Sequence, residues 1–415
     1  MEKEMPFITN DAVVLGLLFI LLGFVFKTST SSNSFWKKFY TYIPAVLMCY
    51  FLPSLFNSLG IIDGDRSQLY FVTSRYMLPA CLVLLTLSTD FKEIIKLGSK
   101  AVIMFLTGTV GIVIGGPLAI LFFSYVAPSV VGAESGEVWR GMTTIAGSWI
   151  GGGANQAAMK EVFEVDDIMF SKMVTVDVIV ANIWMAILLI GAGKSKLMDK
   201  IFKADSSAID EVKEKIELYR ASITRVPTLT DIMLILAIGF GITGISHLLS
   251  DWIAPFLQHN YPELDKYSLT SGFFWLIVIS TTFGLGLSFT KLRELEGAGA
   301  SRIGSVIIYL LVATIGMKMN VLAIFESPGL FLVGIVWMLV HISLLLIVAK
   351  LIKAPFFFVA VGSQANIGGA ASAPVIASAF HPSLAPVGVL LAVLGYALGT
   401  YAAYLCGILM QLVSN

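Results

Sequence analysis

Apolar runs long enough to cross a bilayer recur along the whole chain, separated by short polar segments. A hydrocarbon core about 30 Å thick is spanned by roughly 20 apolar residues in a helix. The pattern therefore predicts an all-α polytopic membrane protein. The predicted spans lie at about 11–28, 39–58, 70–88, 101–127, 168–192, 231–249, 269–289, 303–317, 329–350 and 385–411.

Two further apolar stretches, 139–162 and 354–380, are interrupted by small and polar residues. The first contains GSWIGGGANQAA at 147–158, and the second contains GSQANIGGAASAP at 362–374. Each stretch is either a re-entrant hairpin, which enters and leaves on one face, or a broken helix that crosses the bilayer. The choice between these two structures decides the topology.

The distribution of Lys and Arg favours the hairpins. Cytoplasmic loops of membrane proteins carry an excess of Lys and Arg, and most of the basic residues here lie in 27–38, 89–100, 193–230, 290–302 and 350–353. Two hairpins place all of these segments on one side, whereas a full crossing at the first break would move the basic linker outside. We therefore expect a plasma-membrane protein with both termini outside and the linker in the cytoplasm.

The two halves of the chain repeat each other in order and spacing. Each half then holds five transmembrane helices plus one re-entrant hairpin, which predicts an inverted repeat because the number of crossings per half is odd. The predicted division is 1–192, a cytoplasmic linker at 193–230, and 231–415. The matched positions are Asp11 and Asp231, Gly147 and Gly362, Ser148 and Ser363, Gly152 and Gly368, and Gly153 and Gly369.

Composition and charge agree with a membrane protein and add little else. The chain is 57% apolar and 13% charged, against about 25% charged residues in soluble domains. Its net charge is zero, which gives no indication of a nucleic-acid partner. Within the linker, residues 209–219 have the pattern of a short amphipathic helix, typical of a solvated connector.

The breaks are the predicted binding site for a solute. Interrupted backbone inside a bilayer is tolerated only where it is buried in protein or lines a water-filled cavity, and helix N-termini at such breaks favour anions. The alternative is that the small residues only allow close helix packing. The candidate substrate-binding residues are Ser148, Gly152, Gly153, Asn155, Gln156, Ser363, Gln364, Asn366, Gly368, Gly369 and Ser372.

Asp177 is the leading candidate for the coupling ion, because it lies near the middle of the span at 168–192. A carboxylate there costs on the order of 3 kcal/mol or more, so it usually has a function or a partner. Thr175 and Asn182 share one helix face and are expected to assist at a Na⁺ or H⁺ site. The alternative is an aspartate that is satisfied by local hydrogen bonds or lines an aqueous vestibule. His341, Arg75 and Lys318 are weaker candidates.

No nucleotide-binding, metalloprotease or serine-hydrolase motif occurs in the chain. We therefore expect neither an enzyme nor a cofactor, and an ion gradient as the source of energy. The favoured function is Na⁺- or H⁺-coupled symport of a small organic anion. The alternatives are a cation/proton antiporter and a non-transporting sensor or scaffold that uses the linker.

The segments at 147–159 and 174–185 resemble the YjcL-like family of membrane proteins, whose function is uncharacterised. That family is distantly similar to sodium/glutamate symporters and sodium/citrate carriers, which have glycine-rich tips on re-entrant hairpins. The resemblance implies a homodimer and an elevator movement of one domain against a scaffold. Gly151, Gly152 and Gly153 match the first tip, and Gly368 and Gly369 the second. The second tip lacks the last glycine of those carriers, so their substrate specificity is not transferable.

Overall fold

The computed structural model describes residues 6–43, 45–132, 138–204, 209, 225–319, 328–381 and 384–414, and all of their regular structure is helical. Seven of the described helices are long and apolar enough to cross a membrane, and the number rises to nine if each of two bent pairs counts as one span. The amphipathic helix expected at 209–219 lies outside the described residues, except for its first position.

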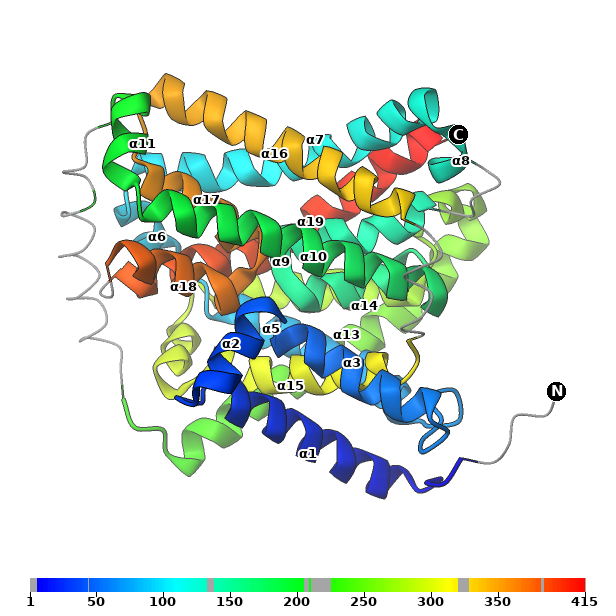
Figure 1. The fold of residues 1–415 in the computed structure, drawn as a ribbon. Coiled ribbons are helices and arrows are strands. Elements are labelled where there is room, and N and C mark those ends of the chain that lie inside the picture. The colour runs from blue at the N-terminus through cyan, green and yellow to red at the C-terminus, as the bar shows by residue number, and fades with distance from the viewer. Residues whose placement is uncertain are drawn as a thin grey trace.

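The first half of the chain contains the helices from α1 to α11 (Figure 1). They are α1 (Asp11–Ser29), α2 (Ser34–Tyr42), α3 (Ala45–Ser58), α4 (Leu69–Val72), the π-helix η1 (Thr73–Met77), α5 (Leu78–Leu87), α6 (Phe91–Lys96), α7 (Ser99–Val126), α8 (Pro128–Val131), α9 (Val138–Val162), α10 (Asp167–Ala192) and α11 (Ser195–Phe202).

The second half has the same order of long helices and one broken element. It contains α13 (Leu229–Asn260), the 3₁₀-helix η3 (Pro262–Tyr267), α14 (Gly272–Leu287), the 3₁₀-helix η4 (Lys291–Ala298), α15 (Ala300–Gly316), α16 (Gly329–Ile352), α17 (Phe356–Ile367), α18 (Gly369–Phe380) and α19 (Ala385–Ser414).

Every predicted span contains a helix, but two of these helices are shorter than expected. The stretch at 39–58 is divided between α2 and α3, whose axes differ by 89°. The stretch at 269–289 contains the 16 residues of α14, followed by η4 at 96° to it. By contrast, α15 has 17 residues and is slightly longer than the span predicted at 303–317. Hydropathy does not detect the first bend, because apolar residues such as Ile43 and Ala45 continue through it, whereas the second bend follows α14 in the polar segment 288–291.

Polar residues begin the first long helix of each half. The Asn10 side chain accepts a hydrogen bond from the backbone N–H of Ala12 at the start of α1. Thr228 and Asp231 form a reciprocal capping box at the start of α13. Such caps satisfy N–H groups that have no partner within the helix.

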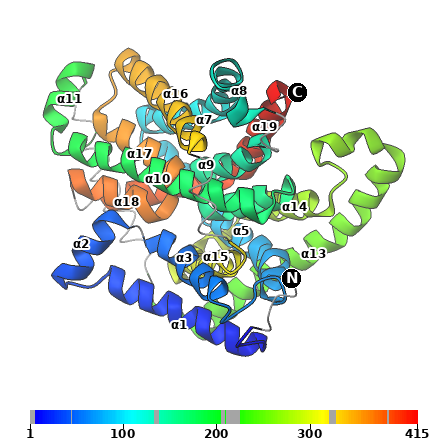
Figure 2. The same ribbon diagram turned by 45° about the vertical axis from the view of Figure 1, so that its right-hand side comes forward.

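The helices form two groups that pack chiefly within themselves. The flanking group consists of α1, α3, α4–α5, α13, α14 and α15, and the hairpin group of α7, α9, α10, α16, α17, α18 and α19. Figures 1 and 2 show the hairpin group above α1, α3 and α15. Each half of the chain contributes first three helices to the flanking group and then a helix, a broken element and a helix to the hairpin group.

The two broken elements reverse the direction of the chain. In α9, Arg140 Nη1 donates to the carbonyl oxygen of Phe163 at 3.1 Å, whereas a straight helix would separate these residues by about 34 Å. In α17–α18, the rings of Phe357 and Phe380 lie 5.2 Å apart. We call α9 the first hairpin and α17–α18 the second hairpin; each has two antiparallel arms.

Glycine allows both reversals. Gly152, at the tip of the first hairpin, has φ 72° and ψ −170°, and Gly369, at the tip of the second, has φ 55°. Side chains disfavour positive φ, and the conformation of Gly152 is adopted almost exclusively by glycine. The glycines therefore fix where each arm ends and the next begins.

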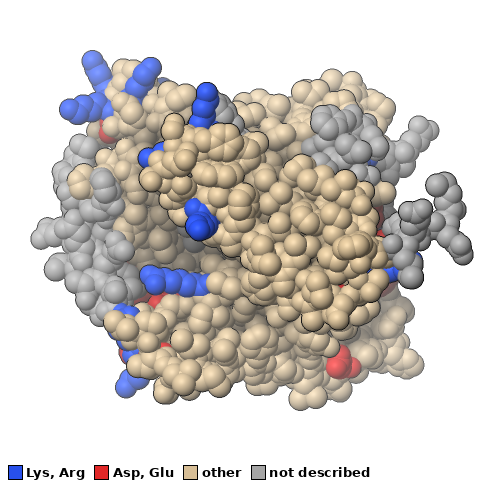
Figure 3. All heavy atoms as spheres, turned by 60° about the horizontal axis from the view of Figure 1, so that its bottom comes forward, with Lys and Arg blue, Asp and Glu red and all other residues tan. Residues whose placement is uncertain are grey.

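The hairpins enter the bundle from opposite ends. The base of the first hairpin lies beside Tyr404, since the rings of Phe163 and Tyr404 stack. Tyr404 is close to the C-terminus of the chain, and its hydroxyl donates to the carbonyl oxygen of Tyr267. The base of the second lies beside α11, where the N–H of Phe356 donates to Asp199. We call these the terminal end and the linker end. Figure 3 shows Lys and Arg gathered mostly toward the linker end, at the left of the view, and a largely uncharged surface elsewhere.

Candidate functional site

A cavity of about 580 Å³ separates the two helix groups at the level of the hairpin tips. The hairpin group contributes both tips and α10, and the flanking group contributes α3 and α15. The lining extends toward the linker end as far as Tyr40 and Ala45. The predicted site residues that line the cavity are Ser148, Gly152, Gly153, Gln156, Asp177, Asn182, Gln364, Gly368, Gly369 and Ser372.

Asp177 is 5% exposed and its carboxylate is surrounded by hydrogen-bond donors. Trp149 Nε1 donates to Oδ1 at 2.6 Å, and Gln156 Nε2 donates to Oδ2 at 2.8 Å. The Ser148 hydroxyl is a third donor. All three donors belong to the first hairpin, and none carries a charge, so the carboxylate is oriented but not neutralised by them.

Gln156 also joins the two helix groups. Its Oε1 accepts a hydrogen bond of 3.2 Å from the hydroxyl of Tyr50, on α3 of the flanking group. An ionised carboxylate can only accept hydrogen bonds, so Gln156 must present its NH₂ group to Asp177 and its oxygen to Tyr50. We call Tyr50, Gln156 and Asp177 the Asp177 relay.

The second tip carries a buried amide with spare bonding capacity. Gln364 Nε2 donates to the Ser372 hydroxyl at 2.8 Å, and Gln364 Oε1 has no partner among the described residues although the residue is 2% exposed. Gln364 and Ser372 both line the cavity. An unpaired buried polar atom is costly, and this one belongs to a side chain that a polar solute or ion in the cavity can reach.

Tyr396 of α19 connects the two tips. A Cβ atom added to Gly152 would lie 3.5 Å from Tyr396 Cε1, and one added to Gly369 would lie 3.5 Å from its hydroxyl oxygen. Tyr396 belongs to α19, the helix that follows the second hairpin, as Asp177 belongs to α10, the helix that follows the first. Sequence analysis did not single out Tyr396. Tyr40, Tyr50 and Tyr309 also line the cavity, and no sequence signal distinguishes them from other aromatic residues in membrane helices.

The other predicted site residues are not part of the cavity lining. Asn155 accepts from Thr400 at 2.7 Å, Asn366 from Thr109 at 2.7 Å, and Ser363 from Trp184 at 2.8 Å. Thr175 donates to the backbone carbonyl of Ser171. The first three of these residues tie the hairpins to neighbouring helices. The structure thus brings Asp177 and Asn182 to one cavity and leaves Thr175 outside it.

Asp177 is the single formally charged residue among the described residues that line the cavity. An organic anion there would find no Lys, Arg or His, and it would have to bind to backbone amides at the hairpin tips. The described residues also contain no cluster of three His, Cys, Asp or Glu residues. A Na⁺ ion at Asp177 would therefore complete its shell with hydroxyl, amide and carbonyl oxygens, which suit hard cations.

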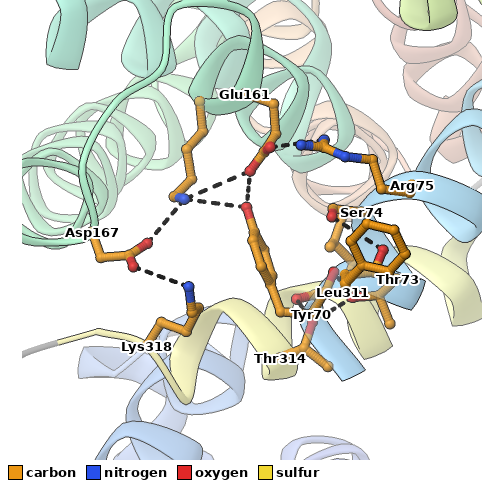
Figure 4. A network of polar contacts seen from close by, with 11 residues as sticks. Tyr70, Thr73, Ser74, Arg75, Glu161, Asp167, Leu311, Thr314 and Lys318 are labelled. Carbon is orange, nitrogen blue, oxygen red and sulfur yellow. Dashed lines mark hydrogen bonds and ion pairs between the residues drawn. The ribbon is translucent and has the colours of Figure 1, made fainter. Parts of the chain in front are cut away.

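A second polar cluster joins the groups at the terminal end (Figure 4). Arg75 Nη1 pairs with Glu161 at 2.8 Å, and Lys318 pairs with Asp167 at 3.4 Å. Lys160, whose side chain is 7% exposed, pairs with Asp167 at 2.9 Å and contacts the hydroxyl of Tyr70, which also bonds Glu161. We call these residues the end network. Its carboxylates already have cationic partners, unlike Asp177.

His341, a weaker candidate from the sequence, is buried within the hairpin group. Its Nε2 is 2.8 Å from the Ser363 hydroxyl, and its Nδ1 is 2.9 Å from the Gly108 carbonyl. These contacts join α16 to α7 and to the second hairpin. Its position is that of a packing and hydrogen-bonding residue, outside the cavity lining.

Comparison with known proteins supplies a family. A family model described as "Protein of unknown function (DUF819)" matches residues 16–413. The chain is 25% identical over 367 residues to a protein of Bacillus subtilis (strain 168) named "Uncharacterized membrane protein YjcL". The alignment covers 85% of this chain and 86% of that protein. The match therefore extends over both halves and both hairpins.

Proposed function

The chain belongs to the DUF819 family, and from that premise we propose that it is a secondary transporter with Asp177 as the site of a coupling cation, Na⁺ or H⁺. The observation that carries the proposal is a buried carboxylate, surrounded by uncharged donors, in a cavity between two helix groups. Intramembrane carboxylates of this kind commonly mark ion or proton pathways. The proposal involves no enzymatic chemistry and no cofactor.

We propose further that the hairpin group moves against the flanking group as an elevator. The matching order of elements in the two halves and the opposite entry of the hairpins support an inverted repeat, with 1–192 and 231–415 as its halves. The basic linker end is assigned to the cytoplasm because of the positive-inside rule, which puts both termini outside. A homodimer remains a proposal carried by the resemblance to sodium-coupled carriers.

The proposed solute is a small organic anion. Support comes from the arms that start at the tips of both hairpins, since helix N-termini carry a partial positive charge. Because Asp177 is the one formal charge of the described lining, an anion can bind well only after Na⁺ or H⁺ has neutralised it. Symport follows from this requirement.

Cation/proton exchange is the second candidate, and the same charge observation favours it. A cationic solute and a proton would compete for Asp177, and sites that exclude double occupancy produce antiport. Proteoliposome uptake distinguishes the two: symport predicts accumulation of carboxylates with an inward Na⁺ or H⁺ gradient, and antiport predicts cation uptake with an outward proton gradient. If neither kind of uptake occurs with any ion gradient, secondary transport is contradicted.

Asp177→Asn is the direct test of the ion site. We expect the purified wild-type protein to become more heat-stable with added Na⁺ or with acidification, because a ligand that binds the native state stabilises it. The Asn variant should lose this response. The measurement is the unfolding temperature in detergent at constant ionic strength, with N-methylglucamine chloride as the balancing salt. An unchanged response in Asp177→Asn would remove Asp177 from the ion site.

A further inference from the structure

Gln156 is the one described side chain that bonds both the candidate ion site and the opposite helix group. It is 2% exposed, with its nitrogen on Asp177 and its oxygen on Tyr50. Asp177 belongs to α10 of the hairpin group, whereas Tyr50 belongs to α3 of the flanking group. A change of charge at the Asp177 carboxylate can therefore be transmitted to the boundary between the helix groups through the Gln156 amide.

An amide has different chemistry at its two ends, and the charge of Asp177 decides which end faces it. The empty, ionised carboxylate needs donors, so it selects the NH₂ group. A bound cation needs oxygen ligands, and a protonated carboxyl group needs an acceptor for its proton. Either occupant therefore favours a reversed amide, with Oε1 toward Asp177 and NH₂ toward Tyr50.

Reversal of the amide changes the contact between the helix groups. The Gln156 NH₂ group can now donate to the Tyr50 hydroxyl oxygen, but the hydroxyl proton, which Gln156 Oε1 accepted before, loses its acceptor. Tyr50 is 2% exposed, so water does not readily replace the lost acceptor. A buried donor without a partner is destabilised, which weakens the hold of α3 on the first hairpin when Asp177 is occupied.

We propose that Gln156 is a positioning residue that reverses its amide when Asp177 is occupied, and thereby couples ion binding to a weakening of the Tyr50 contact between the helix groups. The proposal rests on the proposed function of Asp177 as an ion site. Trp149 takes no part in this switch, because an indole N–H can only donate, and Oδ1 of Asp177 can accept its hydrogen bond in both states.

The sign of the effect of Tyr50 follows from the switch. By donating to Oε1, Tyr50 holds the amide in the orientation that suits the empty carboxylate, so it opposes the cation. Loss of this hydroxyl frees the amide to turn its oxygen inward. Tyr50→Phe should therefore bind the cation more tightly, although the Tyr50 hydroxyl bonds Gln156 and not Asp177 itself.

The experiment measures cation affinity from the rise in unfolding temperature with NaCl, LiCl or KCl at constant ionic strength, together with a pH series in N-methylglucamine chloride. The other titratable side chains of the described cavity lining are Tyr40, Tyr50, Tyr309 and Tyr396. For Tyr50→Phe we expect about three- to tenfold tighter cation binding, the size of one hydrogen bond. If the occupant is a proton, the midpoint of the response moves to higher pH.

The matched control is Tyr401→Phe. Tyr401 of α19 bonds Thr282 of α14 at 2.7 Å, so it also joins the two groups through a tyrosine hydroxyl, but it does not line the cavity. Its cation response should stay within about twofold of the wild-type response, since it touches neither Gln156 nor Asp177. Equal shifts in Tyr50→Phe and Tyr401→Phe would overturn the switch.

A double substitution separates the switch from a general effect of Tyr50 on the fold. In a Gln156→Leu background, Tyr50→Phe should no longer change the cation response, because the residue that transmits the effect is gone. A shift that persists in this background, or weaker binding in Tyr50→Phe alone, overturns the switch and leaves Asp177 as an ion site. A wild-type protein that responds to neither cations nor pH overturns both the switch and the proposed function.

Discussion

The first hairpin meets the flanking group at two places that differ in charge. Beside its tip, Asp177 of α10 faces a cavity and accepts hydrogen bonds from uncharged donors. At its base, ion pairs join Lys160, Glu161 and Asp167 to each other and to Arg75 and Lys318. The tip retains an unneutralised charge that can attract a ligand. The base has opposite charges already paired, which suits a contact that holds the two groups together.

Lys160→Met should have the largest effect on stability. The Lys160 ammonium is almost fully buried and lies 2.9 Å from Asp167 and 3.7 Å from Glu161. The substitution removes the buried cation that contacts Asp167, Glu161 and Tyr70, and leaves the two carboxylates with Lys318 and Arg75 alone, so the free energy of unfolding should fall by about 3 kcal/mol. The measurement is chemical unfolding in detergent, followed by circular dichroism.

Lys92→Met is the control for this substitution, because Lys92 is exposed on α6. Its free energy of unfolding should change by less than about 0.5 kcal/mol, as expected for a surface position. If both variants lost the same stability, the base of the hairpin would not differ from the protein surface, and the contrast between base and tip would be wrong.

Gly152→Ala tests the tip, where the cost is conformational and not electrostatic. Gly152 has φ 72° and ψ −170°, and a Cβ there meets Tyr396 at an ordinary 3.5 Å. The strain of this backbone conformation for alanine predicts a loss of about 2 kcal/mol. In the control Gly153→Ala, φ is not positive and the nearest atom to the added Cβ is 3.9 Å away, so the loss should stay below about 1 kcal/mol.

The same measurement of unfolding applies to both glycine variants. A larger loss for Gly153→Ala than for Gly152→Ala would contradict the assignment of the reversal to Gly152. It would also move the start of the second arm, whose N-terminal amides are part of the proposed anion site.

The sequence predicted the residues around the hairpin tips better than those of the end network. Gly152, Gly369 and Asp177 carry local signals, namely glycine within an apolar stretch and a charge in mid-span, and the structure places all three at one cavity. Arg75 and Lys318 were weaker candidates because cations near the ends of spans can snorkel to the interface, and their partners, Glu161 and Asp167, lie far away in the chain. Such pairs depend on how distant helices pack, which hydropathy does not contain.

The side-chain amides of Asn155 and Gln156 show a second limit of prediction from the sequence. Asn155 and Gln156 are adjacent and equally polar, yet Gln156 lines the cavity while Asn155 bonds Thr400 on the opposite side of the arm. The rotation of a short arm about its axis decides this difference. That rotation is set by contacts with α10 and α19, so the residue pattern of the arm alone could not distinguish the two.

Glu161→Gln should cause the smallest loss of stability among the substitutions in the end network and at the hairpin tip, and it tests a single ion pair. Glutamine keeps an oxygen for Arg75 but removes the charge, and the Arg75 side chain is 32% exposed, so solvent compensates much of the loss. The free energy of unfolding should therefore fall by about 1 kcal/mol. In the control Glu164→Gln, which alters an exposed residue three positions further on, we expect almost no change. Raising the ionic strength with N-methylglucamine chloride should reduce the difference between the two variants, because salt screens exposed ion pairs. A difference that does not depend on salt would mean that Glu161 acts through hydrogen bonding alone, and the base of the hairpin would then resemble the tip.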